Sequence, residues 1–82
     1  MDAVAVAQAV LEKTTKITFP AKRADLFAKF AQVGISLSGD SKTVLDVSGN
    51  PESVFKNLYS SLGSPTVKLA CKRAMASKGV NV

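Results

Sequence analysis

The chain has 82 residues, of which 46% are hydrophobic and 21% charged, and its formal net charge is +5. This length predicts a single domain over residues 1–82, and the composition is typical of a globular protein and not of a disordered chain. The only cysteine, Cys71, excludes an intramolecular disulfide, and the absence of histidine leaves too few ligands for a zinc site. We therefore expect no metal and no cofactor, and the lack of such staples favours a cytoplasmic protein.

No apolar run approaches the roughly 18 residues that a membrane span requires. The N-terminal segment is apolar, but it has no basic residue before Gln8 and Glu12, as a signal peptide would. We expect no membrane-spanning segment and no membrane partner.

The first element expected is a helix over residues 3–13, because its apolar residues recur on one face and Asp2 is a suitable N-cap. The β-branched pair Thr14 and Thr15 ends this pattern. Ile17 and Phe19 then alternate with polar neighbours, which predicts a short strand over residues 16–19 that ends at Pro20.

A second helix is expected over residues 21–33, followed by Gly34 in the left-handed position that often ends helices. Alternating apolar residues at 35–38 and 43–47, separated by turn-forming residues at 39–41, predict a β-hairpin.

Two helix starts then follow the same pattern. Asn50 and Ser64 are suitable N-caps, and each precedes a proline at the first helical position. These signals predict a third helix from residue 51 to about residue 62 and a fourth from residue 65 to about residue 77. All four phenylalanines of the chain occupy periodic positions and are expected in the core.

The expected element order is α-β-α-β-β-α-α, which makes the fold class α+β. A parallel β-α-β unit with a right-handed crossover, extended by the hairpin, would give a three-stranded mixed sheet covered by helices. Whether residues 79–82 add another strand stays open. The order recurs in many folds and indicates no particular family.

The distribution of charge is the one feature that points to a partner. Residues 1–52 contain six basic and six acidic residues, so their charges cancel (6 − 6 = 0). Residues 53–82 contain five basic residues and no acidic one (5 − 0 = +5), so the whole net charge belongs to this part. A one-sided positive charge attracts polyanions such as nucleic acids.

The expected function is therefore that of a small, basic accessory or regulatory protein that binds nucleic acid, DNA or RNA, through its phosphates. Lys68 and Lys72 are four residues apart and share one flank of the fourth helix, while Arg73 lies on its other side. The residues expected to contact phosphate are Lys56, Lys68, Lys72, Arg73 and Lys78. None of them is suited to read base edges, so no sequence specificity is predicted.

A second hypothesis assigns the chain to a different class: an adaptor, inhibitor or subunit that docks on an acidic protein surface. Leu69 lies on the back of the fourth helix among basic residues, which suits a protein partner or a homodimer formed through this helix. A second basic group, formed by residues 13, 16, 22 and 23, would contribute to binding only if the fold brought it beside the fourth helix.

The sequence provides little for catalysis, and we expect a protein that is not an enzyme. General acid–base chemistry would fall to a carboxylate, lysine or tyrosine, yet no two carboxylates have helical spacing and no serine stands in a nucleophile motif. Cys71 shares its face with apolar residues, so it is expected to be buried, and Tyr59 is expected at the rim of the core.

Overall fold

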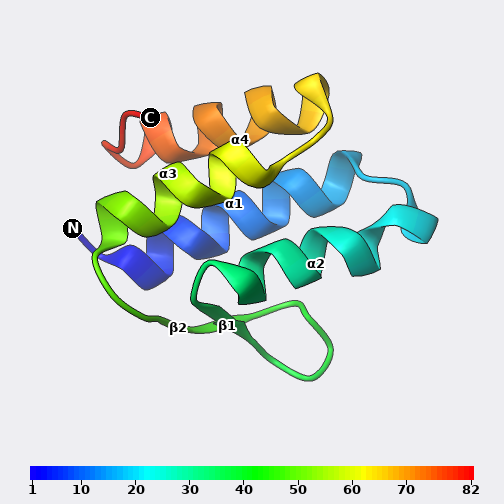
Figure 1. The fold of residues 1–82 in the computed structure, drawn as a ribbon, viewed down its shortest axis with the longest axis horizontal. Coiled ribbons are helices and arrows are strands. Elements are labelled where there is room, and N and C mark those ends of the chain that lie inside the picture. Colours follow the sequence, from blue (N-terminus) through cyan, green and yellow to red (C-terminus); the bar gives the residue numbers. More distant parts are fainter.

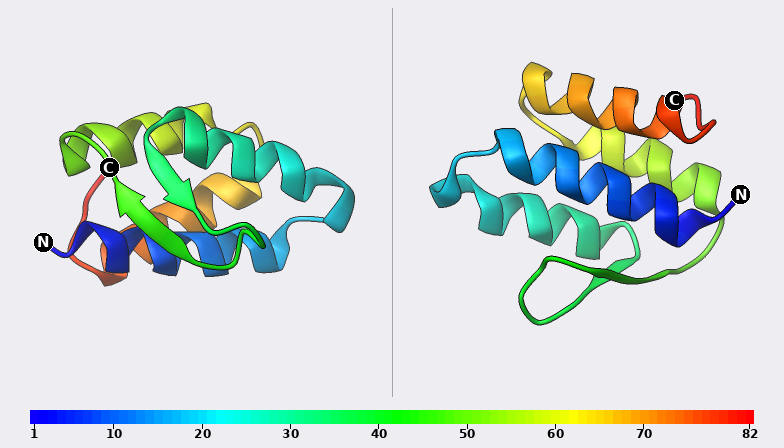
Figure 2. Two further views of the ribbon diagram at one scale, coloured as in Figure 1. Left: turned by 90° about the horizontal axis from the view of Figure 1, so that it is seen from below. Right: turned by 180° about the vertical axis from the view of Figure 1, so that it is seen from behind.

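The computed structural model describes all 82 residues and has an α+β fold of four helices and a two-stranded antiparallel sheet (Figure 1). The helices are α1 (Ala3–Ile17), α2 (Arg23–Gln32), α3 (Pro51–Ser61) and α4 (Pro65–Ser77), and a 3-10 turn (Pro20–Lys22) precedes α2. The strands are β1 (Ile35–Leu37) and β2 (Val44–Val47). Seen from below, α1 and α4 form one layer and α2 and α3 the other, with the hairpin in front of them (Figure 2).

The predicted N-caps are confirmed at three helices. The side chain of Asp2 accepts the backbone N–H of Ala5 at 3.1 Å, and that of Asn50 accepts the N–H of Ser53 at 3.2 Å. The hydroxyl of Ser64 likewise accepts from α4, at 3.4 Å. Each bond satisfies an N–H group that would have no partner inside its helix, so these short polar residues fix where the helices begin.

The strand predicted over residues 16–19 is wrong, because α1 continues to Ile17. Thr14, which was expected to end the helix, is instead accommodated within it. The buried hydroxyl of Thr14 donates to the carbonyl of Val10 at 2.7 Å, and the hydroxyl of Thr18 donates to the carbonyl of Thr14 at 2.6 Å. Thr14 bonds back to the preceding turn and remains helical despite its branched side chain, whereas Thr18 follows the helix as its extended C-cap.

Without that strand the parallel β-α-β unit does not form. The sheet has two strands and not the three expected, and the order is α-α-β-β-α-α. Residues 79–82 also form no strand. Phe19, predicted to be in the core, is 78% exposed in the connection between α1 and α2.

The predicted hairpin is confirmed. Its strands are antiparallel, with Ile35 opposite Val47, and the register shifts after Ser36. Gly34 enters it with a φ of +103°, and a Cβ on this residue would lie 3.1 Å from the carbonyl oxygen of Ser48. Both the left-handed backbone and the close approach require glycine here.

One hydrophobic core joins the helices and the hairpin. Its largest fully buried side chains include Phe30 of α2, Phe55 of α3 and Leu11 of α1. The N-terminal helix α1 packs along α4 on one side and against β2 on the other. Helix α1 is therefore central to the fold, and the sites described below lie on its two sides.

Gln8 of α1 fixes the hairpin in place. Its side-chain oxygen accepts the backbone N–H of Val44 at 2.7 Å, and its Nε2 donates to the carbonyl of Lys42 at 3.0 Å. The same Nε2 also donates to Glu12, one turn further along α1, at 2.8 Å. These bonds determine the position of the hairpin loop relative to α1.

Candidate nucleic-acid interface

Of the five residues predicted to contact phosphate, one lies on α3 (Lys56), three lie on α4 (Lys68, Lys72 and Arg73), and Lys78 directly follows α4. Lys56, Lys72, Arg73 and Lys78 are exposed, and Lys68 is half-buried. One face of α4 packs into the core through Cys71, Ala74 and Met75. The apolar contacts of α4 therefore hold its basic side chains at the surface.

Lys68 is oriented by an aromatic ring on the neighbouring helix. Its Nζ lies 5.1 Å from the centroid of the Tyr59 ring, which belongs to the last turns of α3. This is a cation–π contact, worth about 0.5–1 kcal/mol at a partly exposed site. The contact holds the ammonium group of Lys68 between α3 and α4.

Two further lysines lie about one helical turn from the contact between Lys68 and Tyr59. The short connection between α3 and α4 makes them antiparallel, as Figure 1 shows. Lys72 lies one turn beyond Lys68 on the same flank of α4, and Lys56 lies nearly one turn before Tyr59 on α3. We call Lys56, Lys68 and Lys72 the α3–α4 basic seam.

Arg73 and Lys78 do not belong to the seam. Arg73 follows Lys72 directly, so its side chain is rotated by about 100° around the helix axis. Lys78 is the C-cap of α4, where a positive charge is favoured by the helix dipole. The five residues thus form a seam of three lysines, with two cations that project elsewhere.

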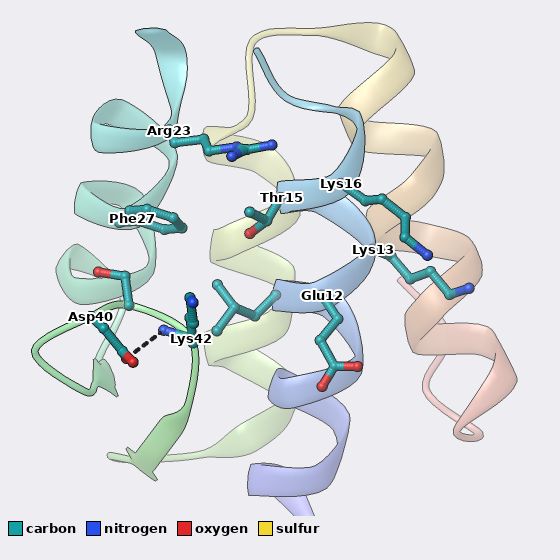
Figure 3. Close-up of a pocket in the computed structure, with 10 residues that line it drawn as sticks. Glu12, Lys13, Thr15, Lys16, Arg23, Phe27, Asp40 and Lys42 are labelled. Atoms are coloured by element: carbon teal, nitrogen blue, oxygen red, sulfur yellow. Dashed lines mark hydrogen bonds between the residues drawn. The ribbon is translucent and has the colours of Figure 1, made fainter. Parts of the chain in front are cut away.

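The second basic group of the sequence is divided by the fold. Lys13 and Lys16 extend from α1 toward α4, whereas Arg23 lies over the opposite side of α1 (Figure 3). Lys22 lies on the 3-10 turn before α2, at a different hollow. Two members of this group therefore approach α4.

Two other side chains of α4, Leu69 and Cys71, concern the protein-interface hypothesis and the reactivity of the only cysteine. Leu69, proposed as part of a protein interface, is 47% exposed. Cys71 is fully buried, and burial raises the pKa of its thiol to about 12. The thiol is therefore a poor nucleophile at neutral pH, because the thiolate is the reactive form.

Sequence reasoning missed one hollow, on the side of α1 that faces the hairpin. Arg23 and Phe27 of α2, Thr15 of α1 and Lys42 of the hairpin loop line it (Figure 3). These residues are up to 27 positions apart in the chain, so no local pattern brings them together. The hollow forms because the hairpin packs against α1, a contact that the sequence did not predict.

The comparisons with known proteins assign no family to the chain. No protein-family model, no curated protein and no solved structure matches it. The structure contains no group of three or more potential metal ligands. None of its helices has the length and apolar character needed to cross a bilayer.

Proposed function

We propose that this protein binds nucleic acid through phosphate contacts, in an accessory or regulatory role. The observation that carries the proposal is the α3–α4 basic seam, in which Lys68 and Lys72 share a flank of α4 and Lys68 contacts Tyr59 of α3. No acidic residue follows Glu52 in the sequence, so α4 carries no carboxylate of its own. Lys68 and Lys72 therefore lack a carboxylate partner in their own helix and are suited to release counterions from a phosphate backbone.

The surroundings of the seam favour binding that does not depend on base sequence. The Tyr59 ring is in contact with Lys68 and is only partly exposed, so it is not a platform on which bases stack. Lysines act on phosphates as point charges, and Arg73 adds a planar group able to contact two phosphate oxygens. Lys13 and Lys16 would extend the contact surface from α1. We place this activity in the cytoplasm, for DNA or RNA.

The test is a titration of the full chain with labelled single- and double-stranded DNA and RNA of about 20 nucleotides, at several salt concentrations. Affinity is expected to fall steeply between about 50 and 200 mM salt. Lys72→Ala and Lys68→Ala are each expected to weaken binding and to lower the slope of log affinity against log salt by about one unit.

The matched control is Lys42→Ala. Lys42 is an exposed lysine of the hairpin loop, on the other side of α1 from α4. Equal losses from Lys42→Ala and Lys72→Ala would show that net charge alone attracts the ligand. No binding at low salt by the parent protein would refute the proposal.

The exposure of Leu69 favours a second candidate, in which α4 docks on an acidic protein or on another copy of the chain. An apolar side chain surrounded by cations gives such an interface both a contact and an electrostatic preference. Sedimentation of the parent and of Leu69→Ser tests the homodimer: a dimer that the substitution dissociates would support it. A protein that is monomeric at all concentrations would exclude the homodimer and leave only docking on an acidic protein.

A further inference from the structure

The hollow on the hairpin side of α1 has the features of a second binding site. It has a volume of about 550 Å³, within the range of sites that hold small molecules. Ten residues from α1, α2 and the hairpin loop line it: Leu11, Glu12, Lys13, Thr15, Lys16, Arg23, Phe27, Asp40, Ser41 and Lys42. It lies across α1 from the α3–α4 basic seam, and the two surfaces share only Lys13 and Lys16 at the edge of the hollow.

Two cations from separate elements project over this hollow. The guanidinium of Arg23 extends from the start of α2 toward α1, and the Lys42 side chain rises from the loop between Phe27 and α1 (Figure 3). The Nε of Arg23 donates to the carbonyl of Thr18 at 3.1 Å. This bond fixes the plane of the guanidinium and leaves its two terminal nitrogens to form a fork toward an anion.

The two acidic residues of the hollow are engaged in other hydrogen bonds. Asp40 accepts the hydroxyl of Ser38 at 2.6 Å and the backbone N–H of Lys42 at 3.1 Å. Glu12 accepts Nε2 of Gln8 at 2.8 Å. Asp40 thereby shapes the loop that carries Lys42. Of the four basic residues in the lining, Lys13 and Lys16 extend toward α4, so Arg23 and Lys42 are the cations that project over the hollow.

The remaining lining provides a flat apolar wall and an unsatisfied polar atom. The half-buried ring of Phe27 faces Thr15 across the hollow (Figure 3). The buried Oγ1 of Thr15 has no hydrogen-bond partner. A buried hydroxyl without a partner is uncommon in folded proteins, and strain, a catalytic role or a bound water or ion can account for one.

We propose that this hollow binds a small organic phosphate with an aromatic ring, of the nucleoside monophosphate class. Arg23 and Lys42 contact the phosphate, and the ring of the ligand lies against Phe27. Arginine forks match phosphate oxygens, and the aromatic face of Phe27 suits a planar base. The Gln8 clamp on the hairpin loop holds Lys42 in position without contacting the ligand.

Isothermal titration of the full chain at low salt tests the proposal with AMP, adenosine and inorganic phosphate as probes. AMP is expected to bind at least about tenfold more tightly than either fragment, because each fragment keeps only half of the contacts. Arg23→Gln and Lys42→Met are each expected to weaken AMP binding by about tenfold, as the loss of a hydrogen bond to a charged group would. Phe27→Leu should bring the affinity for AMP close to that for phosphate.

Lys72→Met is the matched control, because it removes the same charge from the other side of α1. Lys72→Met should weaken oligonucleotide binding and leave AMP binding unchanged. Lys42→Met should weaken AMP binding and leave oligonucleotide binding unchanged. Adenosine binding as tightly as AMP, or equal losses from Lys42→Met and Lys72→Met, would overturn the proposal. An absence of AMP binding at millimolar concentration would overturn it as well. If Arg23→Gln fails to fold, Lys42→Met carries the test, because Lys42 lies on an exposed loop.

Discussion

The side-chain oxygen of Gln8 accepts the backbone N–H of Val44 at 2.7 Å, although the two residues are 36 positions apart. Val44 begins β2, and its side chain is buried in the core. The same Gln8 side chain bonds the carbonyl of Lys42. One glutamine therefore satisfies both a donor and an acceptor of the hairpin backbone, where no neighbouring strand is present to do so.

Gln8→Ala is expected to lower the free energy of unfolding by about 1–3 kcal/mol, because the Val44 N–H would lose its partner in a partly buried position. Urea unfolding measures the change. Gln32→Ala removes an exposed glutamine from the end of α2 and should change stability by less than about 0.5 kcal/mol. Identical transitions for Gln8→Ala and the parent would mean that the hairpin does not depend on this residue.

Phe30→Ala is expected to cost about 3–5 kcal/mol, because the side chain is completely buried and its removal leaves a cavity. This cost is a large part of the stability of so small a protein. Phe19→Ala removes the same side chain from a position that is 78% exposed, so it should cost little. Thermal melts of the two variants make the comparison, and similar losses would contradict the burial described for Phe30.

Neighbouring threonines of α1 are expected to respond oppositely to the same substitution. Thr14→Val loses a hydrogen bond of 2.7 Å to Val10 and should destabilise the protein by about 0.5–1.5 kcal/mol. Thr15→Val removes a buried hydroxyl that has no partner, so it should raise stability by up to about 1 kcal/mol. Calorimetry of both variants tests the difference in sign, and a loss from Thr15→Val would indicate that its hydroxyl is satisfied.

Asp40 should make the hairpin loop sensitive to acid. The hydrogen bond from Ser38, followed by the backbone N–H of Lys42, lowers the pKa of its carboxyl below 3.8. A carboxyl with a lowered pKa in the folded state stabilises the fold above its unfolded pKa, and this contribution is lost as the pH falls through the folded value. Asp40→Asn should therefore be less stable than the parent at pH 7.

The difference between Asp40→Asn and the parent should narrow as the pH falls below about 3.8, where the parent also loses its carboxylate. Urea unfolding of both proteins from pH 7 to pH 2 measures it. A difference that stays constant across this range would show that the charge of Asp40 contributes nothing to stability.

Local signals in the sequence predicted most of the elements. Asn50 and Ser64 with their following prolines determined two helix starts, because capping depends on residues within one turn of the helix. The end of α1 was not predictable in the same way. Threonine favours strands when only its branched side chain is considered, but Thr14 lies in the core and bonds to its own helix.

The two candidate sites also differ in whether local spacing in the sequence could predict them. The spacing of Lys68 and Lys72 predicted that they share a flank of one helix, and the contact with Tyr59 adds how that flank faces α3. Lys42 and Arg23 have no such relationship in sequence. They line one hollow only because the hairpin folds back onto α1, an arrangement that the predicted three-stranded sheet would not have produced.

The packing of α1 along α4 has a consequence for folding during synthesis. Helix α1 is synthesised well before its partner α4 and before Val80, which is also buried in the core. Until then Val10 and Leu11, which are fully covered in the complete fold, lack part of the surface that covers them. Nascent chains stalled before α4 should therefore be sensitive to proteases and bound by chaperones.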